Sequence, residues 1–319
     1  DANENVRLYT TTSDIISAAA DSNSYSVTKQ TNDFGYPIVK ATSDSALIAL
    51  DYVKQYSNIT FKSYDDPARI VITSKWDEID SATVSKSTQV RVKGGIKSPI
   101  LKEVKKDDKI TILDSGDKWD KVATEDGVIG YIKRKALSES KKTKLTNPDY
   151  EEETFTHIKK DKDICLAWNQ VTSQSANSKV PQVISSTKGI NVMSPTWFYL
   201  NDNNGNLADI ASKDYVSYCH SQGIEVWGLF SNLENTDVDA AYVLTHTSTR
   251  TTLINQIMSA AFNYELDGVN IDFENITEAA YGDSYIEFIR ELAIKCHNNG
   301  ISLSVDVTVP ASFNKFFNR

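Results

Sequence analysis

The chain has 319 residues, of which 40% are hydrophobic and 24% are charged, a composition typical of a folded globular protein. Its formal net charge of −9 argues against a nucleic-acid partner, and no apolar run approaches the roughly 20 residues that span a bilayer. The three cysteines (Cys165, Cys219 and Cys296) and four histidines are scattered, so we expect no disulfide framework, no metal and no cofactor.

Residues 1–80 are predicted to form a small α+β module. The pattern predicts helices at Ser13–Asp21 and Ala46–Tyr56, and strands at Ile59–Tyr64 and Ile70–Thr73. An Asp-Asp-Pro turn ending at Pro67 separates the two strands and predicts a hairpin. The runs that begin at Ala49, Asn58 and Arg69 resemble the amine-oxidase N-terminal-like modules of bacterial surface proteins. This resemblance implies a wall-associated spacer or adhesion module.

Residues 83–138 are predicted to form a small β-barrel, because short β-prone runs alternate with turn residues. The five runs are Val90–Val92, Ser98–Ile100, Lys109–Leu113, Trp119–Val122 and Gly127–Ile132. The phrase Trp119-x-x-Val122, followed by Asp126-Gly127 and Gly130-Tyr-Ile132, resembles bacterial SH3-like domains. The resemblance implies a module that binds the bacterial cell wall or holds a neighbouring domain.

The remaining chain divides into a charged linker at 139–160 and a third domain at 161–319. In this domain strands are predicted at Cys165–Trp168, Asn191–Leu200, Ile224–Phe230, Gly268–Glu274 and Ile301–Val309, and helices at Lys213–Gln222, Arg250–Tyr264 and Ser284–Asn298. Gly223 and Gly300 follow two of these helices, where a positive φ is favoured. Alternation of strands and helices predicts parallel βαβ units. Because an eight-stranded β/α barrel takes ~250 residues, we expect a barrel truncated after about five strands.

The most informative segment is 266–275, which reads Leu-Asp-Gly-Val-Asn-Ile-Asp-Phe-Glu-Asn. Its apolar and polar residues alternate with the period of a strand, which puts Asn270, Asp272 and Glu274 on one face. In a β/α barrel that face would line the interior, where carboxylates cost several kcal/mol unless they are paired or used. An edge strand with one solvated face would give the same pattern.

This segment resembles the Asp-Gly-x-Asp-x-Asp-x-Glu signature of family 18 glycoside hydrolases, which are chitinase-like enzymes built on a TIM barrel. Asp267, Gly268, Asp272 and Glu274 match it, whereas Asn270 replaces an aspartate. The flanking runs Ser194-Pro-Thr-Trp-Phe-Tyr, Asn201-Asp and Gly223-Ile-Glu-Val-Trp are similar to the spore-germination, cortical-fragment-lytic branch of the family. The resemblance covers about the second half of the chain.

The resemblance implies a substrate-assisted, retaining mechanism. Glu274 would protonate the glycosidic oxygen and later act as base toward water, while Asp272 would orient the 2-acetamido group of the sugar. Asp267 and Gly268 are expected to be structural, with Asp267 tying the entrance of the strand to its neighbour. Asn270 cannot carry negative charge but can still hydrogen-bond to Asp272.

Aromatic side chains near the predicted strand ends are candidates for contacting sugar rings. Tyr199, Trp197 and Trp227 are expected there, because barrel sites form at the carboxyl ends of strands, and Trp168 is expected in the core. Packing in the core is the alternative for each. Asp306 and Thr308 alternate with apolar residues on the fifth predicted strand and could line the same cavity as substrate contacts.

The sequence therefore favours a glycoside hydrolase that cleaves N-acetylglucosamine linkages in peptidoglycan or spore cortex. The resemblance implies a protein that acts outside the cell, at a bacterial wall or spore, which the SH3-like domain contacts. A chitinase or endo-acting glycan hydrolase with the same residues is one alternative. A glycan-binding wall protein without turnover is the other, and the expected truncation makes the activity of this chain doubtful.

Overall fold

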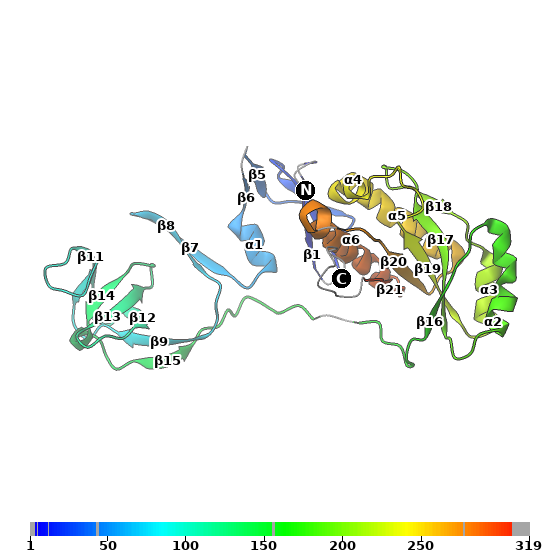
Figure 1. Cartoon of the computed structure of the whole chain (residues 1–319). Helices are drawn as coiled ribbons and strands as arrows, with labels where there is room; N and C mark the ends of the chain where they lie inside the picture. Colours follow the sequence, from blue (N-terminus) through cyan, green and yellow to red (C-terminus); the bar gives the residue numbers. More distant parts are fainter. Residues whose placement is uncertain are drawn as a thin grey trace. The chain divides into compact units, whose positions relative to one another are not determined.

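The computed structural model describes residues 4, 6–11, 13–42, 45–154, 157–276 and 278–307 (Figure 1). The chain divides into two compact units, the first made of Asp1–Leu47 and Glu153–Arg319 and the second of Ile48–Glu152. The fold is mixed α/β, with a parallel sheet in the first unit and a large antiparallel sheet in the second. Within the described residues, none of the helices is both long and apolar enough to cross a membrane.

The first unit opens with an antiparallel sheet in the order β1-β2-β3-β4. Its strands are β1 (Val6–Thr10), β2 (Ile15–Ala19), β3 (Ser24–Val27) and β4 (Gln30–Asp33). The helix predicted at Ser13–Asp21 is wrong, since this segment forms β2. Ile16 and Ala18 are buried, two residues apart as in a strand, and β2 has a paired neighbour on each side. Pairing on both sides outweighs the helix propensity of the alanines.

The helix predicted over Ala46–Tyr56 forms only in its second part. Strand β5 (Val39–Ala41) pairs with β6 (Ala46–Ile48), and helix α1 (Leu50–Tyr56) begins two residues later. The three residues from Ala46 are therefore used in a strand pair before the chain can turn into a helix.

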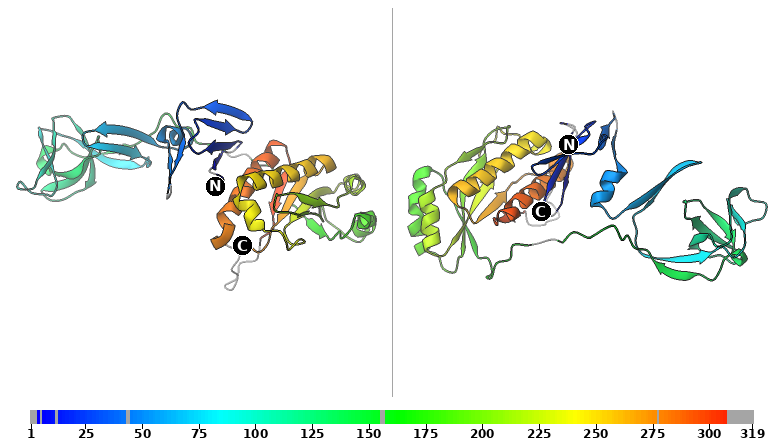
Figure 2. Two further views of the ribbon diagram at one scale, coloured as in Figure 1. Left: turned by 90° about the horizontal axis from the view of Figure 1, so that it is seen from above. Right: turned by 180° about the vertical axis from the view of Figure 1, so that it is seen from behind.

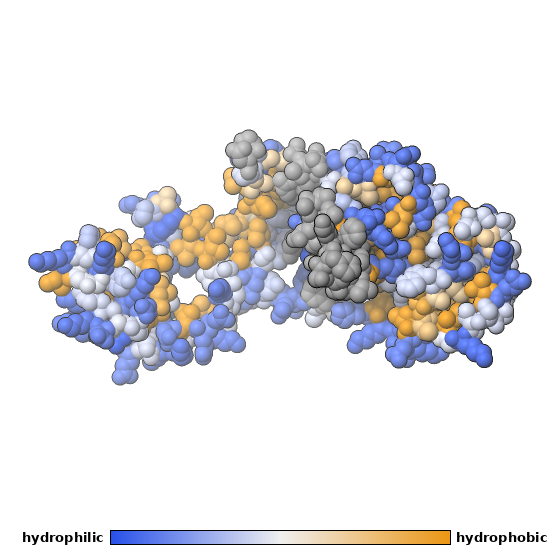
Figure 3. Space-filling view, viewed as in Figure 1, coloured by the Kyte–Doolittle hydropathy of each residue, from blue (hydrophilic) through white to orange (hydrophobic). Residues whose placement is uncertain are grey.

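The second unit contains the predicted hairpin, formed by β7 (Thr60–Asp65) and β8 (Ala68–Thr73). Arg69 donates to the backbone oxygen of Asp126 at 2.8 Å and forms an ion pair with its carboxylate. Val71 packs against Gly127, where a Cβ would lie 2.4 Å from Cγ2 of Val71. Ile70 and Ile72 point to the opposite, exposed face of β8. Figure 3 shows the apolar surface over β7, β8 and α1.

The rest of this unit is an antiparallel sheet of seven strands, in the order β11-β10-β14-β13-β12-β9-β15. Its strands are β9 (Glu78–Thr83), β10 (Thr88–Arg91), β11 (Ile100–Val104), β12 (Lys109–Asp114), β13 (Trp119–Thr124), β14 (Ile129–Lys133) and β15 (Lys141–Lys144), with a 3-10 turn, η1, at Arg134–Ala136. Four of the five predicted β segments correspond to β10, β12, β13 and β14, whereas Ser98–Ile100 shares only Ile100 with β11. Strand β15 lies inside the segment predicted as a linker, and its four exposed residues, Lys-Lys-Thr-Lys, carry no apolar alternation that could have indicated a strand.

The parallel sheet of the first unit has the order β16-β17-β19-β20-β21, and β18 adds to β17 in the antiparallel sense. Its strands are β16 (Leu166–Asn169), β17 (Val192–Leu200), β18 (Leu207–Asp209), β19 (Glu225–Ser231), β20 (Gly268–Asp272) and β21 (Ser302–Val305). The helical segments are η2 (Gln174–Lys179), α2 (Val180–Ser185), α3 (Lys213–Ser221), α4 (Ala240–Thr245), α5 (Thr247–Tyr264) and α6 (Glu278–Asn298). Figure 2 shows sheet and helices from two sides.

This arrangement confirms the predicted parallel βαβ units: five strands pair in parallel, and helices join them. Gly223 and Gly300 have φ of 72° and 70°, as expected after helix ends. Val269, Ile271 and Phe273 are fully buried, and Phe273 stacks on Phe288 of α6. The odd-numbered residues of β20 therefore face the helices, which leaves the even-numbered ones on the opposite face.

Candidate active site

The entrance of β20 is fixed by Asp267 and Gly268. The Asp267 carboxylate accepts a hydrogen bond from the backbone N–H of Val226 at 2.8 Å and lies 2.8 Å from Nε2 of His220. A Cβ on Gly268 would lie 2.5 Å from Cγ of Trp227, so only glycine fits against this indole ring. These contacts hold β20 in register with β19.

Asn270 and Asp272 follow on the face opposite the helices. In the parallel register Asn270 lies beside Ser304, and Ile271 lies beside Val305, so Asp306 follows next to Asp272. The amide of Asn270 donates to Oδ2 of Asp306 at 2.8 Å and accepts from the Ser304 hydroxyl. In the described part of the chain no hydrogen bond joins Asn270 to Asp272, although the sequence analysis expected the Asn270 amide to bond to this carboxylate.

Asp272 has the most perturbed carboxyl of this cluster. Burial raises its pKa to about 6, and the negative charges of Asp306, Glu274 and Glu234 add to the effect. Burial also raises the pKa of Asp306, although hydrogen bonds from Asn270 and from the indole of Trp168 act in the opposite direction. A carboxyl with such a pKa changes its protonation state close to neutral pH.

Glu274 lies two residues beyond Asp272, and Asn232 fixes its backbone. The Glu274 N–H donates to Oδ1 of Asn232 at 2.9 Å, and Nδ2 of Asn232 donates to the Glu274 carbonyl at 3.1 Å. The Glu274 side chain is exposed. The next residue, Asn275, has a φ of 61°, and its carbonyl accepts a hydrogen bond from the Tyr281 hydroxyl at 3.3 Å.

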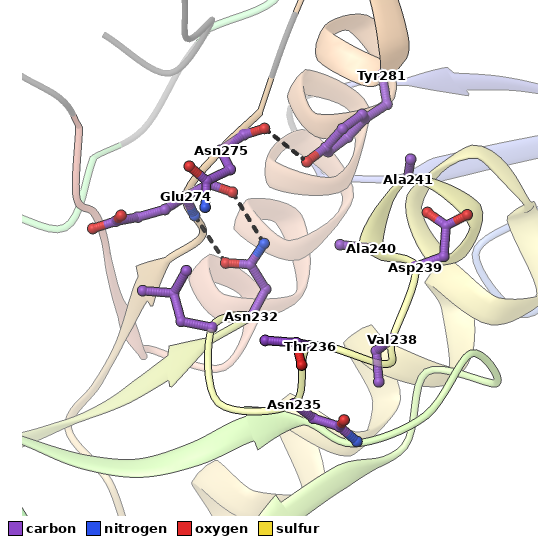
Figure 4. A pocket seen from close by; sticks show the side chains of 11 residues that line it. Asn232, Asn235, Thr236, Val238, Asp239, Ala240, Ala241, Glu274, Asn275 and Tyr281 are labelled. Atoms are coloured by element: carbon purple, nitrogen blue, oxygen red, sulfur yellow. Dashed lines mark hydrogen bonds between the residues drawn. The ribbon is translucent and has the colours of Figure 1, made fainter.

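Glu274 borders a cavity of about 300 Å³ between the segment after β19 and the start of α6 (Figure 4). Its lining includes amide, hydroxyl and carboxylate groups, from Asn232, Asn235, Thr236, Asp239, Glu274, Asn275 and Tyr281, together with Leu233, Val238, Ala240 and Ala241. Figure 4 shows the Glu274 side chain pointing away from Tyr281, Asp239 and Ala240, so the backbone end of Glu274 borders this polar cavity.

Tyr199 is the predicted aromatic residue that lies in the same row as Asp272. The register pairs Tyr199 with Ser231 and Ser231 with Asp272, so the three side chains lie on one face. Tyr199 is partly exposed, and Ser231 donates its hydroxyl hydrogen bond to Glu234. Tyr199 therefore remains a candidate for contacting a ligand.

Trp197 and Trp227 do not lie at an accessible site. Trp197 occupies a register shift between Thr196 and Phe198, is 0% exposed, and donates its indole N–H to Asn177 at 2.7 Å. Trp227 is buried and pairs with Gly268 on β20. Strand β19 continues for four more residues to Ser231, which is the residue that pairs with Asp272. Both rings therefore pack in the core, which is the alternative that the sequence left open for each of them.

Trp168 shows the opposite departure from the prediction. It was expected in the core, but it is 62% exposed near the end of β16, where it acts to lower the pKa of Asp306. Asn232 and Glu234, which directly follow β19, were also missed. The rule that sites form at the carboxyl ends of parallel strands could have indicated all three. Thr308 lies outside the described residues.

Within the described residues no cluster of His, Cys, Asp and Glu side chains is suited to hold a metal ion. Burial raises the pKa of the Cys219 and Cys296 thiols to about 12, and both pack in the core, whereas Cys165 is exposed. The side chains described above at the end of β20 are carboxylates, amides and aromatic rings.

No protein-family model matches the sequence, and no curated protein matches it. Among solved structures, a chitinase of Chromobacterium violaceum aligns at 18% identity and a TM-score of 0.40, covering 49% of this chain and 50% of that one. A class V chitinase of Pseudomonas fluorescens aligns at 14% identity and 0.41, covering 49% and 48%. The spore cortex-lytic enzyme SleL of Bacillus megaterium aligns at 18% identity and 0.40, covering 48% and 37%. The chain thus spans half or less of the length of these structures.

Proposed function

We propose that this chain carries the acid–base residues of a retaining glycoside hydrolase that cleaves N-acetylglucosamine linkages with help from the substrate. The observation that carries the proposal is the pair Asp272 and Glu274. They lie two residues apart at the carboxyl end of a central parallel strand, with a raised pKa at Asp272 and a cavity beside Glu274. Two carboxyl groups in different environments are suited to different roles.

In the proposed reaction Glu274 transfers its proton to the glycosidic oxygen as the C1–O bond breaks. The carbonyl oxygen of the 2-acetamido group attacks C1 and forms an oxazolinium ion, whose N–H faces Asp272. Water then attacks C1, and Glu274 takes its proton, so the sugar is released with retained configuration. The exposed side chain of Trp168 and the partly exposed side chain of Tyr199 would supply the aromatic surface for the sugar ring.

For the substrate we propose peptidoglycan or spore cortex, and for the protein a location outside the cell. The support is the pair of wall-type modules that the sequence predicts ahead of the catalytic part, at 1–80 and 83–138. The SH3-like identity of the second and its contact with the wall belong to the same proposal. Chitin is the alternative substrate, because its linkages carry the same acetamido group.

The test is product analysis by mass spectrometry after incubation with cortical muropeptides and, separately, with chito-oligosaccharides. We expect N-acetylglucosamine products from the unmodified chain and at least 100-fold less from Glu274→Gln, since loss of a general acid costs about 10²–10⁴-fold. Glu265→Gln is the matched control, because it removes an exposed glutamate just before β20, at the opposite end of the strand.

Binding measurements with the same glycans distinguish the enzyme from a wall protein without turnover. An enzyme loses hydrolysis in Glu274→Gln but keeps binding. Binding by both chains with no products from either would refute the proposed hydrolase and favour the binding protein.

A further inference from the structure

The contacts of Asn270 reveal a carboxylate that the strand motif does not contain. Asn270 is only 1% exposed, so both ends of its amide require partners. The Ser304 hydroxyl donates to Oδ1, which leaves Nδ2 to donate to Oδ2 of Asp306 at 2.8 Å. Ser304 thereby fixes which way the amide points, and the amide in turn fixes Asp306.

Asp306 is also held through its backbone. Its N–H donates to the carbonyl of Ile271 at 2.8 Å, which extends the pairing of β20 and β21 by one residue. The Asp306 carboxylate is therefore anchored beside Asp272 by groups from β20 and β21, and Trp168 on β16 acts to lower its pKa.

We propose that Asp306 takes the place of the carboxylate missing at position 270 and is the positioning residue that pairs electrostatically with Asp272. This inference rests on the proposed function, because it assigns Asp306 a role in the same reaction. Asn270 acts as a neutral bridge between the two strands. Asp306 thus acts through Asp272, and not as the substrate contact that strand parity alone predicts.

The charges around Asp272 support this pairing. The charged groups that raise its pKa are Asp306 after β21, Glu274 after β20 and Glu234 after β19, and Asp272 in turn raises the pKa of Tyr285 on α6. Apart from burial, the negative charge of Asp306 has the largest effect on the pKa of Asp272. An aspartate at 270 would add a carboxylate against Asp306, and like charges so close are unfavourable. Carboxylates at both 270 and 306 would therefore repel each other and raise the pKa of Asp272 further.

Three variants of the full chain test the inference: Asp306→Asn, Asn270→Asp, and the double exchange that carries both. The first readout is the pKa of the Asp272 carboxyl, measured by NMR titration of ¹³C-labelled protein without substrate. In Asp306→Asn we expect this pKa to fall by about 1 pH unit, and in Asn270→Asp to rise by about as much. In the double exchange it should return to within about half a unit of the original, because one carboxylate again faces Asp272.

The second readout is the pH dependence of kcat, which should move in the same direction as the titration. An unchanged Asp272 titration in Asp306→Asn overturns the inference, as does a double exchange in which the pKa of Asp272 stays as low as in Asp306→Asn. The titration needs no turnover, so its outcome is separate from that of the proposed function. If the titrations shift as expected but the chain cleaves no glycan, the pairing of Asp306 with Asp272 is supported and the proposed hydrolase is refuted.

Discussion

Replacing Asp272 by asparagine should stabilise the fold at neutral pH, because the ionised carboxylate is held in an unfavourable environment. In the folded chain its pKa is about 6, whereas an aspartate in an unfolded chain has a pKa of about 3.9. A difference of about 2 pH units corresponds to about 3 kcal/mol of folding free energy. Since Asp272 is only half-buried, solvent screening reduces this figure, and we expect about 1–2 kcal/mol.

The pH dependence has a definite sign. Well below its unfolded pKa of about 3.9 the carboxyl is protonated in the folded and the unfolded chain, so its ionisation contributes nothing to the difference between them. As the pH rises toward the folded pKa of about 6 the unfolded chain loses the proton first, and the free energy of unfolding falls. The stabilisation by Asp272→Asn should therefore be small at about pH 4 and reach its full value above about pH 7.

Urea denaturation at pH 4.0, 5.0, 6.0 and 7.5, followed by tryptophan fluorescence, measures this difference. Asp237→Asn is the control, because it removes one negative charge from an exposed residue of the loop that follows β19. Equal stabilisation at pH 4.0 and pH 7.5, or a destabilised Asp272→Asn chain at pH 7.5, would refute the reasoning. A gain that grows with pH would identify Asp272 as a group kept at a cost in stability, as expected of a functional residue.

Three further substitutions test the framework of the site. Gly268→Ala should cost about 1–3 kcal/mol, because its Cβ would overlap the Trp227 indole, and an unchanged urea midpoint would mean that the ring can move aside. Glu291→Gln leaves Arg250 without its buried ionic partner and should lower stability by about 3–5 kcal/mol in thermal unfolding; a loss below 1 kcal/mol would contradict this. Asn232→Ala removes two hydrogen bonds from the backbone of the candidate acid, each worth about 0.5–1.5 kcal/mol, so kcat should fall about 5- to 100-fold with little change in KM. A higher KM at constant kcat would assign Asn232 to substrate binding instead.

Local sequence pattern predicted those elements that stand out as apolar, β-prone runs or as helical repeats between turn residues. The five parallel strands and the helix ends at Gly223 and Gly300 were found because periodicity and positive φ are local properties of the chain. Strands β2 and β15 were missed because their pairing partners, and not their own residues, determine their conformation. Strand β15 pairs with β9, about 60 residues earlier in the sequence.

The same limit applies to the site residues. The motif indicated Asp272 and Glu274, and strand parity indicated Asp306, but the contact from Asn270 to Asp306 depends on the register between two strands. Trp197 was misjudged because a register shift at that residue turns its ring toward Tyr215 and Tyr264, on the helix side of the sheet. Neither effect can be read from residue spacing alone.

The register shift at Trp197 also determines which changes of chain length β17 can tolerate. It lets Thr196 and Tyr199, an odd number of residues apart, point to the same face of the sheet, next to Leu229 and Ser231. Deleting one residue here would remove the register shift, and either Tyr199 or Thr196 would then point to the other face of the sheet. We therefore expect homologous chains to vary in residue type at this bulge while keeping its length, so that a gap in β17 would mark a relative whose site is built differently.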